Sequence, residues 1–510
     1  MAGVDRSAAS YYVHNLLGVP QDAPLIKMHA GHIKIDSKHN DSMFFWHFQN
    51  QHIADRRRTI IWLNGGPGCS SEDGALMEIG PYRMADKNSL RLNPGSWNKF
   101  ASLLFVDNPL GTGFSYVDEH SYPRSLPEMA SQFVSFLEEF FAIFPDYEQD
   151  DIYLAGESYA GQYIPYIAKA IMERNAASYR SSTEPWRIKG LLIGNGWISP
   201  KDQYGSFATF AFNRGLQNKD TDEGKSLLSL VSHCQQAMGN SPTIAEYPEC
   251  AQLRAAVKQA PTRGDGEPAC YNVYDIRLND SYPSCGMNWP PDLEFVTPYL
   301  NRPDVASQLH AQKYPGSGWQ ECAKGVGSAL RSAGDQPSIH LFPGLLEEIP
   351  ILLYSGAEDL ICNHIGTENM IESLEWGGAK GFGDTSAGSA QQWTLDGELA
   401  GVWQEARNLT YVLFYNSSHM VPFDHPRRSQ SMLHRFIGVE AGDPTGSFKD
   451  TSLTGNGVGA YWLQKTDYAN DGLSNAMLSL AIISAAAFGY VIFRRCRDRA
   501  RYCRLPVTEV

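Results

Sequence analysis

The sequence predicts an α/β fold with a mixed, mostly parallel central sheet. Strand and helix signals alternate through the first 200 residues, which is typical of parallel strands joined by helical connections. An apolar run at 152–155 breaks at a glycine, presents Ser158 and continues into a long helical stretch. Two polar loops, around Asp359 and His419, also follow apolar strands, where the ligand-facing loops of an open sheet lie.

The first elements are predicted from side-chain patterns. Residues 32–35 and 43–48 are typical of strands, and the apolar run 103–106 of a fully buried strand. Residues 125–128 have the form of a capping box with a proline just inside the helix start. Apolar residues then recur at helical spacing until Pro145, and we interpret them as core residues: Phe133, Phe136, Leu137, Phe140, Phe141 and Phe144.

A glycine-rich loop follows the apolar run at 59–61 and reads Asn64-Gly65-Gly66-Pro67-Gly68-Cys69. Without side chains, its N–H groups can come within bonding range of the charge that develops on an attacked carbonyl. A tight turn without chemistry is the alternative for such a loop alone. Its combination with Ser158 favours an oxyanion hole.

The turn Gly156-Glu157-Ser158-Tyr159-Ala160 has the form of a nucleophile elbow and therefore predicts an α/β-hydrolase fold. Ala160 stands where the usual Gly-x-Ser-x-Gly pattern has its second glycine, and Gly161 follows one place later. In this fold the acid and then the histidine follow the serine along the chain. His419 is the candidate base, and spacing leaves both Glu358 and Asp359 open as the acid that orients it.

These motifs, together with the stretch His-Met-Val-Pro-Phe-Asp from 419, resemble the serine carboxypeptidases over about residues 8–438. The resemblance implies Ser158 as nucleophile, Asp359 as orienting acid and His419 as general base. It assigns the oxyanion hole to the N–H groups of Gly66 and Tyr159.

The resemblance also implies an exopeptidase, with the terminal carboxylate of the substrate held by residues matching Asn64, Gly65, Glu78 and Glu157. Carboxyls crowded in a partly buried site raise one another's pKa, and a neutral acid can donate a hydrogen bond to an incoming carboxylate. We therefore expect an acidic optimum for peptide hydrolysis. A strand-end salt bridge is the alternative for Glu157.

Within the family, the nearest resemblance is to the membrane-bound pheromone-processing group of fungi, which trims C-terminal Lys and Arg. It rests on residues 28–32, 280–290 and 417–419, where Ser418 replaces the glycine of vacuolar-type relatives. The expected partners are thus peptides that end in Lys or Arg. Asp73 is the candidate acid of the pocket for that residue, with Cys362 and Met420 beside it; alternatively, Asp73 caps the helix beginning near Gly74.

Three other functions share parts of this pattern. A broad-specificity vacuolar-type carboxypeptidase or a carboxypeptidase-like acyltransferase would keep the triad. A membrane-anchored binding protein could use a catalytically dead hydrolase scaffold. The presence of all three triad residues argues against the last of these.

Seven of the nine cysteines precede the C-terminal tail, so at least one thiol of the main domain is free. The resemblance implies that Cys69 pairs with Cys322 and that Cys362 stays free. The other four, Cys234, Cys250, Cys270 and Cys285, can pair in three ways. Disulfides imply an oxidising compartment, as do the glycosylation sequons at Asn40, Asn279, Asn408 and Asn416.

Residues 1–440 are expected to form one hydrolase domain with a helical cap insertion at about 197–314, followed by a polar linker at 441–472. Residues 473–493 carry no charge and are long enough to span a bilayer as a helix. The arginine-rich tail 494–510 then places the catalytic domain in the lumen, as in a single-pass type I protein of the trans-Golgi network. Met1–Arg6 shows no signal-peptide pattern, so we expect an incomplete or mature N-terminus.

No zinc pattern, phosphate loop or dinucleotide fingerprint stands out, and we expect neither a cofactor nor a metal. The net charge of −14 argues against nucleic-acid binding.

Overall fold

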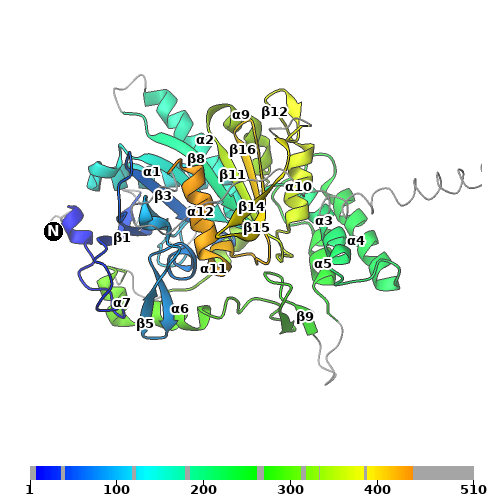
Figure 1. The fold of residues 1–510 in the computed structure, drawn as a ribbon, viewed down its shortest axis with the longest axis horizontal. Helices are drawn as coiled ribbons and strands as arrows, with labels where there is room; N and C mark the ends of the chain where they lie inside the picture. The colour runs from blue at the N-terminus through cyan, green and yellow to red at the C-terminus, as the bar shows by residue number, and fades with distance from the viewer. Residues whose placement is uncertain are drawn as a thin grey trace, which may run out of the picture. The chain divides into compact units, whose positions relative to one another are not determined.

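The computed structural model describes residues 7–35, 41–117, 122–178, 184–260, 269–311, 318–331, 334–383 and 388–439 (Figure 1). The predicted linker, membrane span and tail lie outside the described residues, as does Asn40. Within the described ranges, no helix is long and apolar enough to cross a membrane.

A ten-stranded sheet forms the centre, in the order β1-β2-β6-β3-β7-β8-β11-β16-β15-β14. The six strands from β6 to β16 in this order run parallel, and the two strands at each edge pair antiparallel. The predicted mixed, mostly parallel sheet is therefore confirmed. Its strands are β1 Met28–Lys34, β2 Ser42–Phe48, β3 Arg58–Leu63, β6 Ser102–Val106, β7 Asp151–Glu157, β8 Arg187–Gly194, β11 Ile351–Gly356, β14 Gln391–Leu395, β15 Glu398–Ala406 and β16 Leu409–Phe414.

Three two-stranded hairpins lie outside this sheet in the described part of the chain. They are β4 Tyr82–Asp86 with β5 Ser89–Leu92, β9 Ala269–Tyr271 with β10 Asn279–Ser281, and β12 Glu375–Trp376 with β13 Ala379–Lys380.

Side chains alternate between the two faces of a strand, so neighbouring residues of β2 reach opposite layers. The ring of Phe45 lies 5.4 Å from that of Phe140 in α1 (Leu126–Ile143). Trp46 belongs to the same core cluster as Met432 and Leu433 of α12 (Pro426–Phe436), the orange helix of Figure 1. Helices thus cover both faces, which explains why the central strands are apolar throughout.

Helix α1 begins as predicted. The Ser125 hydroxyl accepts a hydrogen bond from the N–H of Glu128 at 3.2 Å. The Glu128 carboxylate binds the N–H of Arg124 at 2.9 Å and not that of Ser125, so the capping box is only half formed. The helix ends at Ile143, before Pro145, and the predicted aromatic residues are buried.

The chain between β8 and β11 is largely helical. Helices α3, α4 and α5 lie side by side (Figure 1) and share a core cluster of their own. The whole stretch contains α3 Pro200–Asn213, α4 Asp222–Met238, α5 Pro248–Val257, α6 Leu293–Leu300, α7 Pro303–Gln308, α8 Lys324–Arg331 and α9 Phe342–Glu348. The predicted cap at about 197–314 covers most of these helices, and its boundaries remain a prediction.

The remaining helices of the described residues are distributed along the chain between the elements given above. They are α2 Ala160–Ser178, α10 His364–Ser373 and α11 Val421–Asp424, with the short helices η1 Ala8–Tyr11, η2 Gly74–Glu78, η3 Trp97–Lys99, η4 Pro145–Tyr147 and η5 Ser338–Leu341.

The described residues contain three disulfides: Cys69–Cys322, Cys234–Cys250 and Cys270–Cys285. The first is the pair that the resemblance implied, and the other two select one of the three pairings that the sequence left open. Cys362 is free and buried.

Candidate active site

Ser158 lies directly after β7 in the sharp turn that the sequence predicted. Its φ of 60° lies in the left-handed region, which non-glycine residues avoid unless their surroundings fix them. Its N–H donates to the Gly194 carbonyl at 3.0 Å, and its own carbonyl accepts from the N–H groups of Gly161 at 3.0 Å and Trp197 at 2.7 Å. These three hydrogen bonds hold the strained backbone of Ser158 and so fix the position from which its side chain projects.

His419 and Asp359 form a buried pair. The Nδ1 of His419 lies 2.8 Å from Oδ2 of Asp359. The same carboxylate accepts from Nδ2 of Asn195 at 2.7 Å and from the N–H of Ile361 at 3.0 Å. A carboxylate held by donors on both oxygens keeps the proton of the imidazole on Nδ1, which leaves Nε2 able to act as a base.

The choice between the two adjacent acids is resolved by their partners. Glu358 forms an ion pair with Arg214, whereas Asp359 contacts the imidazole. Of the two, only Asp359 is therefore placed to orient the base.

Cys362 connects the serine with this pair. Its thiol is hydrogen-bonded to the side chain of Ser158. Its Sγ and one ligand-type atom each of Asp359 and His419 lie within 4.8 Å of one another. Burial, together with the charge of Asp359, raises the pKa of the thiol well above its usual range, so Cys362 is a poor nucleophile and would have to lose a proton to bind a metal.

The glycine-rich loop packs against the serine turn. A Cβ on Gly65 would lie 2.4 Å from the N atom of Tyr159, so this approach requires glycine, and Gly66 has a φ of 106°. Among the described residues, the N–H groups of Gly65, Gly66 and Tyr159 donate no hydrogen bond to protein. Three amide donors are thus available beside the Ser158 hydroxyl.

Two buried glutamates, Glu78 of η2 and Glu157 of β7, interact side chain to side chain next to these donors. Burial raises the pKa of Glu78 to about 7, and burial together with the charge of Glu78 raises the pKa of Glu157 well above its usual range. Raised pKa values in both glutamates favour a pair that holds a proton at acidic pH, and its role in binding the substrate carboxylate remains a prediction.

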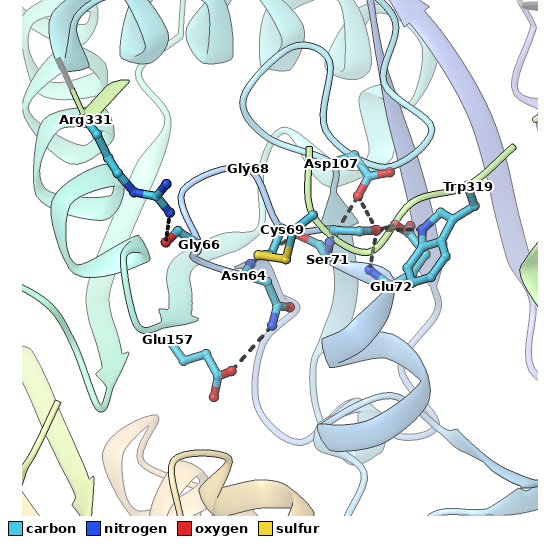
Figure 2. The surroundings of a disulfide bond; sticks show 12 residues. Asn64, Gly66, Gly68, Cys69, Ser71, Glu72, Asp107, Glu157, Trp319 and Arg331 are labelled. Carbon is cyan, nitrogen blue, oxygen red and sulfur yellow. Dashed lines mark hydrogen bonds between the residues drawn. A yellow bond between two sulfur atoms is a disulfide. The ribbon is translucent and has the colours of Figure 1, made fainter. Parts of the chain in front are cut away.

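Asn64 lies beside the pair, and Figure 2 shows its amide pointing at Glu157. Its Oδ1 accepts from Trp62 Nε1 at 2.7 Å and from the N–H of Gly74 at 3.1 Å, which turns Nδ2 toward Glu157 Oε1 at 3.5 Å.

Asp73 is buried, and its side chain makes no capping bond to η2, so the capping alternative lacks its hydrogen bond. Its Oδ1 has no hydrogen-bond partner. Burial, with the neighbouring acids Glu321, Glu78 and Asp107, raises the pKa of Asp73 well above its usual range. Burial also raises the pKa of Glu321 to about 7. Sequence reasoning missed Glu321, because it lies 248 positions from Asp73 and only the fold brings them together.

A cavity of about 100 Å³ opens beside the serine. Its lining includes Ser158, Cys362 and the amides of the glycine-rich loop, but neither Asp73 nor Met420. Met420 is buried in the main core cluster, so the structure gives no support to its predicted place in the pocket. Its other lining residues are aromatic, charged or apolar, and they include Trp197, Tyr204, Ile244, Glu246, Arg254, Arg331 and Ile361.

Two further residues of the site were missed at the sequence level. Asn195 orients Asp359, and its position just after the apolar run of β8 is the same strand-end signal that identified Asp359 and His419. Tyr274 accepts the N–H of His419 at 2.8 Å through its backbone carbonyl, and no sequence motif indicates this contact.

The predicted glycosylation residues that the structure describes, Asn279, Asn408 and Asn416, are all exposed. The Oδ1 of Asn416 accepts from Arg277 at 2.9 Å.

Comparisons with known proteins agree with this geometry. The sequence profile described as "Serine carboxypeptidase" matches residues 19–439. The "Pheromone-processing carboxypeptidase KEX1" of Metarhizium acridum is 52% identical over 526 residues, which cover 99% of this chain and 85% of that protein. The protein of the same name from Sordaria macrospora is 55% identical over 454 residues, which cover 88% of this chain and 69% of that protein.

Among solved structures, the Kex1 prohormone-processing carboxypeptidase of Saccharomyces cerevisiae aligns with a TM-score of 0.78 and 38% sequence identity. The alignment covers 85% of this chain and 96% of that one.

Proposed function

The chain belongs to the serine carboxypeptidase family, and from this premise we propose that it removes C-terminal Lys and Arg from peptides during precursor processing. The names of its relatives, which refer to pheromone and prohormone processing, support the choice of substrate. The observation that carries it is the buried Asp73, whose Oδ1 has no hydrogen-bond partner and whose pKa is raised by burial and by the neighbouring acids Glu321 and Glu78.

The proposed first step forms an acyl-enzyme. His419 takes the proton of the Ser158 hydroxyl, which attacks the last peptide carbonyl. Asp359 holds the imidazolium that forms, and the N–H groups of Gly66 and Tyr159 stabilise the negative oxygen of the tetrahedral intermediate. His419 then gives the proton to the leaving amine, and the C-terminal amino acid departs.

In the second step, water takes the place of the serine hydroxyl. His419 removes a proton from the water, which attacks the acyl-enzyme ester, and the same two amides stabilise the new tetrahedral intermediate. Collapse returns the proton to Ser158 and releases the shortened peptide. Its new C-terminus can bind for another round.

Restriction to the last residue follows from the proposed carboxylate site. The terminal carboxylate accepts from Nδ2 of Asn64, from the N–H of Gly65 and from the acid hydrogen of Glu78 or Glu157. An internal peptide bond would bring no charge to this site and would leave buried donors without a partner. An exopeptidase is therefore the expected outcome.

Substrate binding is expected to weaken as pH rises through neutrality. Both glutamates have a raised pKa, about 7 for Glu78, so the pair is neutral at acidic pH and Glu78 gains a negative charge, which repels the terminal carboxylate, as pH rises through neutrality. We expect KM for a Leu-ended peptide to rise about tenfold from pH 6 to 8, and less than threefold in Glu78→Gln, which stays neutral at this position.

Steady-state kinetics across pH 4 to 8 measure this effect. Glu173→Gln, a change at an exposed residue of α2, is the matched control and should follow the unmodified enzyme. A KM that is flat or falls above pH 7 in the unmodified enzyme contradicts the proposed carboxylate site.

Asp73 is proposed to receive the basic side chain of the leaving residue, with Glu321 as the second acid. A charge-assisted hydrogen bond from Lys or Arg to a buried carboxylate is worth on the order of 1–3 kcal/mol, which is ten- to hundred-fold in selectivity. Because the pKa of Asp73 is raised, the free acid is neutral at acidic pH and a bound cation must draw its proton off. The preference for Lys over Leu should therefore increase with pH.

Asp73→Asn is expected to lower the ratio of kcat/KM for Lys-ended over Leu-ended peptides by ten- to hundred-fold. The Leu-ended peptide is the internal control and should be cleaved at a similar rate by both enzymes. A peptide panel that differs only in its last residue gives the ratio. A Lys preference that survives unchanged would remove Asp73 from the pocket.

The same panel separates the alternatives. A broad-specificity carboxypeptidase would cleave Leu-ended peptides at least as well as Lys-ended ones. A binding protein on a dead scaffold would neither cleave them nor react with an organophosphonate at Ser158.

For location, we propose a lumenal catalytic domain anchored in the trans-Golgi membrane by residues 473–493, with Asn279, Asn408 and Asn416 glycosylated. The run of uncharged residues followed by arginines supports the anchor. Alkaline carbonate should leave the full chain in the membrane pellet and release a chain that ends at residue 472. Release of the full chain would refute the anchor.

A further inference from the structure

A buried group of polar side chains lies beside the Cys69–Cys322 disulfide (Figure 2). The Oγ of Ser70 lies 2.5 Å from Oε2 of Glu72 and 2.7 Å from Oδ1 of Asp107. The Nε1 of Trp319 donates to the same Oγ at 2.9 Å. Ser70, Glu72 and Asp107 are fully buried, so these three side chains contact one another out of reach of solvent.

Counting protons shows that one of the two acids is neutral. The Ser70 hydroxyl has a single hydrogen, and the indole of Trp319 can only donate to it. Ser70 can therefore donate to one carboxylate and must accept from the other, which requires a proton on that acid. Two ionised carboxylates would leave one of the short contacts without any hydrogen.

The surroundings place this proton on Glu72. Asp107 accepts two further bonds, from the N–H of Ser71 at 3.0 Å and from that of Phe114 at 2.7 Å, which favour its ionised form. The Oε2 of Glu72 contacts Ser70, and its Oε1 has no partner. The Glu72 side chain also interacts directly with that of Asp107. Burial, with the neighbouring charge of Asp107, raises the pKa of Glu72 well above its usual range.

The group joins two segments of the site. We call residues 318–323 the strap. It carries Glu321, and it is bonded to the glycine-rich loop by Ser70 N–H to the Glu321 carbonyl at 2.7 Å and by Ala323 N–H to the Gly68 carbonyl at 2.8 Å. Trp319 anchors the strap to Ser70, and the disulfide closes the link.

We propose that Glu72 is a positioning residue that acts as a neutral acid: it donates to Ser70, Ser70 donates to Asp107, and this relay holds the strap against the glycine-rich loop. The relay thereby sets the place of Gly66 and of the two pocket acids, Asp73 and Glu321. Because Glu72 can lose its proton, the geometry of the site depends on pH. This dependence is separate from the ionisation of Glu78 and Glu157, which face the substrate.

Loss of this proton adds a second negative charge to a site already rich in acids. Asp107 faces Glu72 from the loop after β6, and Asp73, which follows Glu72 in the chain, has Glu78 from η2 and Glu321 from the strap as its acidic neighbours. An acid with a raised pKa in the folded state keeps its proton after the unfolded chain has lost it, so stability falls as pH rises above the ordinary range of glutamate.

Glu72→Gln, Asp107→Asn and Glu72→Leu test the relay. The amide of glutamine can donate to Ser70 as the neutral acid does, but it never ionises. We expect Glu72→Gln to keep kcat/KM on a Leu-ended peptide within about threefold at pH 5 and to extend activity to higher pH. The slope of its unfolding free energy against pH reports how many protons are taken up or released on unfolding. Denaturant unfolding at several pH values should show that this number is smaller by up to one proton in Glu72→Gln.

Asp107→Asn should behave in the opposite way, because asparagine offers only one oxygen: its NH₂ group faces either the N–H of Phe114 or both the N–H of Ser71 and the Ser70 hydroxyl. We expect at least a tenfold loss of kcat/KM at every pH, and a similar loss in Glu72→Leu, which removes the donor. If Asp107→Asn is tolerated and Glu72→Gln is not, or if Glu72→Gln keeps the pH profile and unfolding slope of the unmodified enzyme, the proposal is wrong. Neither readout depends on the Lys and Arg preference.

Discussion

Ser158→Ala is expected to lower kcat for peptide hydrolysis by at least about 10⁴-fold, because no other described group beside the site can form the acyl-enzyme. The neighbouring thiol of Cys362 has a raised pKa and supplies little thiolate. Substrate binding should change little, since the proposed carboxylate donors are untouched. Single-turnover hydrolysis gives the rate constant, and equilibrium binding of a Leu-ended peptide gives the affinity.

Labelling with an organophosphonate provides the second readout. The unmodified enzyme should gain one label on Ser158, and the alanine variant none. Ser131→Ala, at an exposed residue of α1, is the matched control and should keep both activity and label. If Cys362→Ala abolished turnover and labelling while Ser158→Ala retained them, the nucleophile would be the thiol.

The parts of the site that the sequence predicted are those coded within short segments. The turn at Ser158 depends on its immediate neighbours, and the loop through Gly65 and Gly66 is marked by its own run of glycines, although Gly65 is required by a contact with the distant residue Tyr159. Strand ends also carry local signals, because an apolar run that stops at a polar residue marks the edge of the sheet. Asp359 and His419 were found in this way.

The parts that the sequence could not predict depend on contacts between distant segments. Asp359 and Glu358 are adjacent, and only the position of Arg214 decides that Glu358 has another partner. Glu321 meets Asp73 only through the fold. The protonation of Asp73 depends on its burial and on the charges of several neighbouring acids. Neither the burial nor the set of neighbours can be read from the sequence.

Asp359→Asn is expected to lower kcat by on the order of 10⁴-fold at neutral pH. The carboxylate accepts from Asn195 and His419 on Oδ2 and from the N–H of Ile361 on Oδ1. An asparagine offers one oxygen and one NH₂ group, so in either orientation a donor faces a donor. With NH₂ toward the imidazole, Nδ1 must accept, the proton moves to Nε2, and the base can no longer take the proton of Ser158.

Glu358→Gln is the matched control, because it changes the adjacent acid from carboxylate to amide at a residue that binds Arg214 and not the imidazole. We expect its kcat to stay within about threefold of the unmodified enzyme. The two variants are compared by initial rates on one Leu-ended peptide between pH 4 and 8, with folding checked by thermal unfolding. Equal losses in both would mean that the loop carrying the two acids, and not the Asp359 carboxylate itself, determines the rate. A large loss in Glu358→Gln alone would reverse the assignment of the orienting acid.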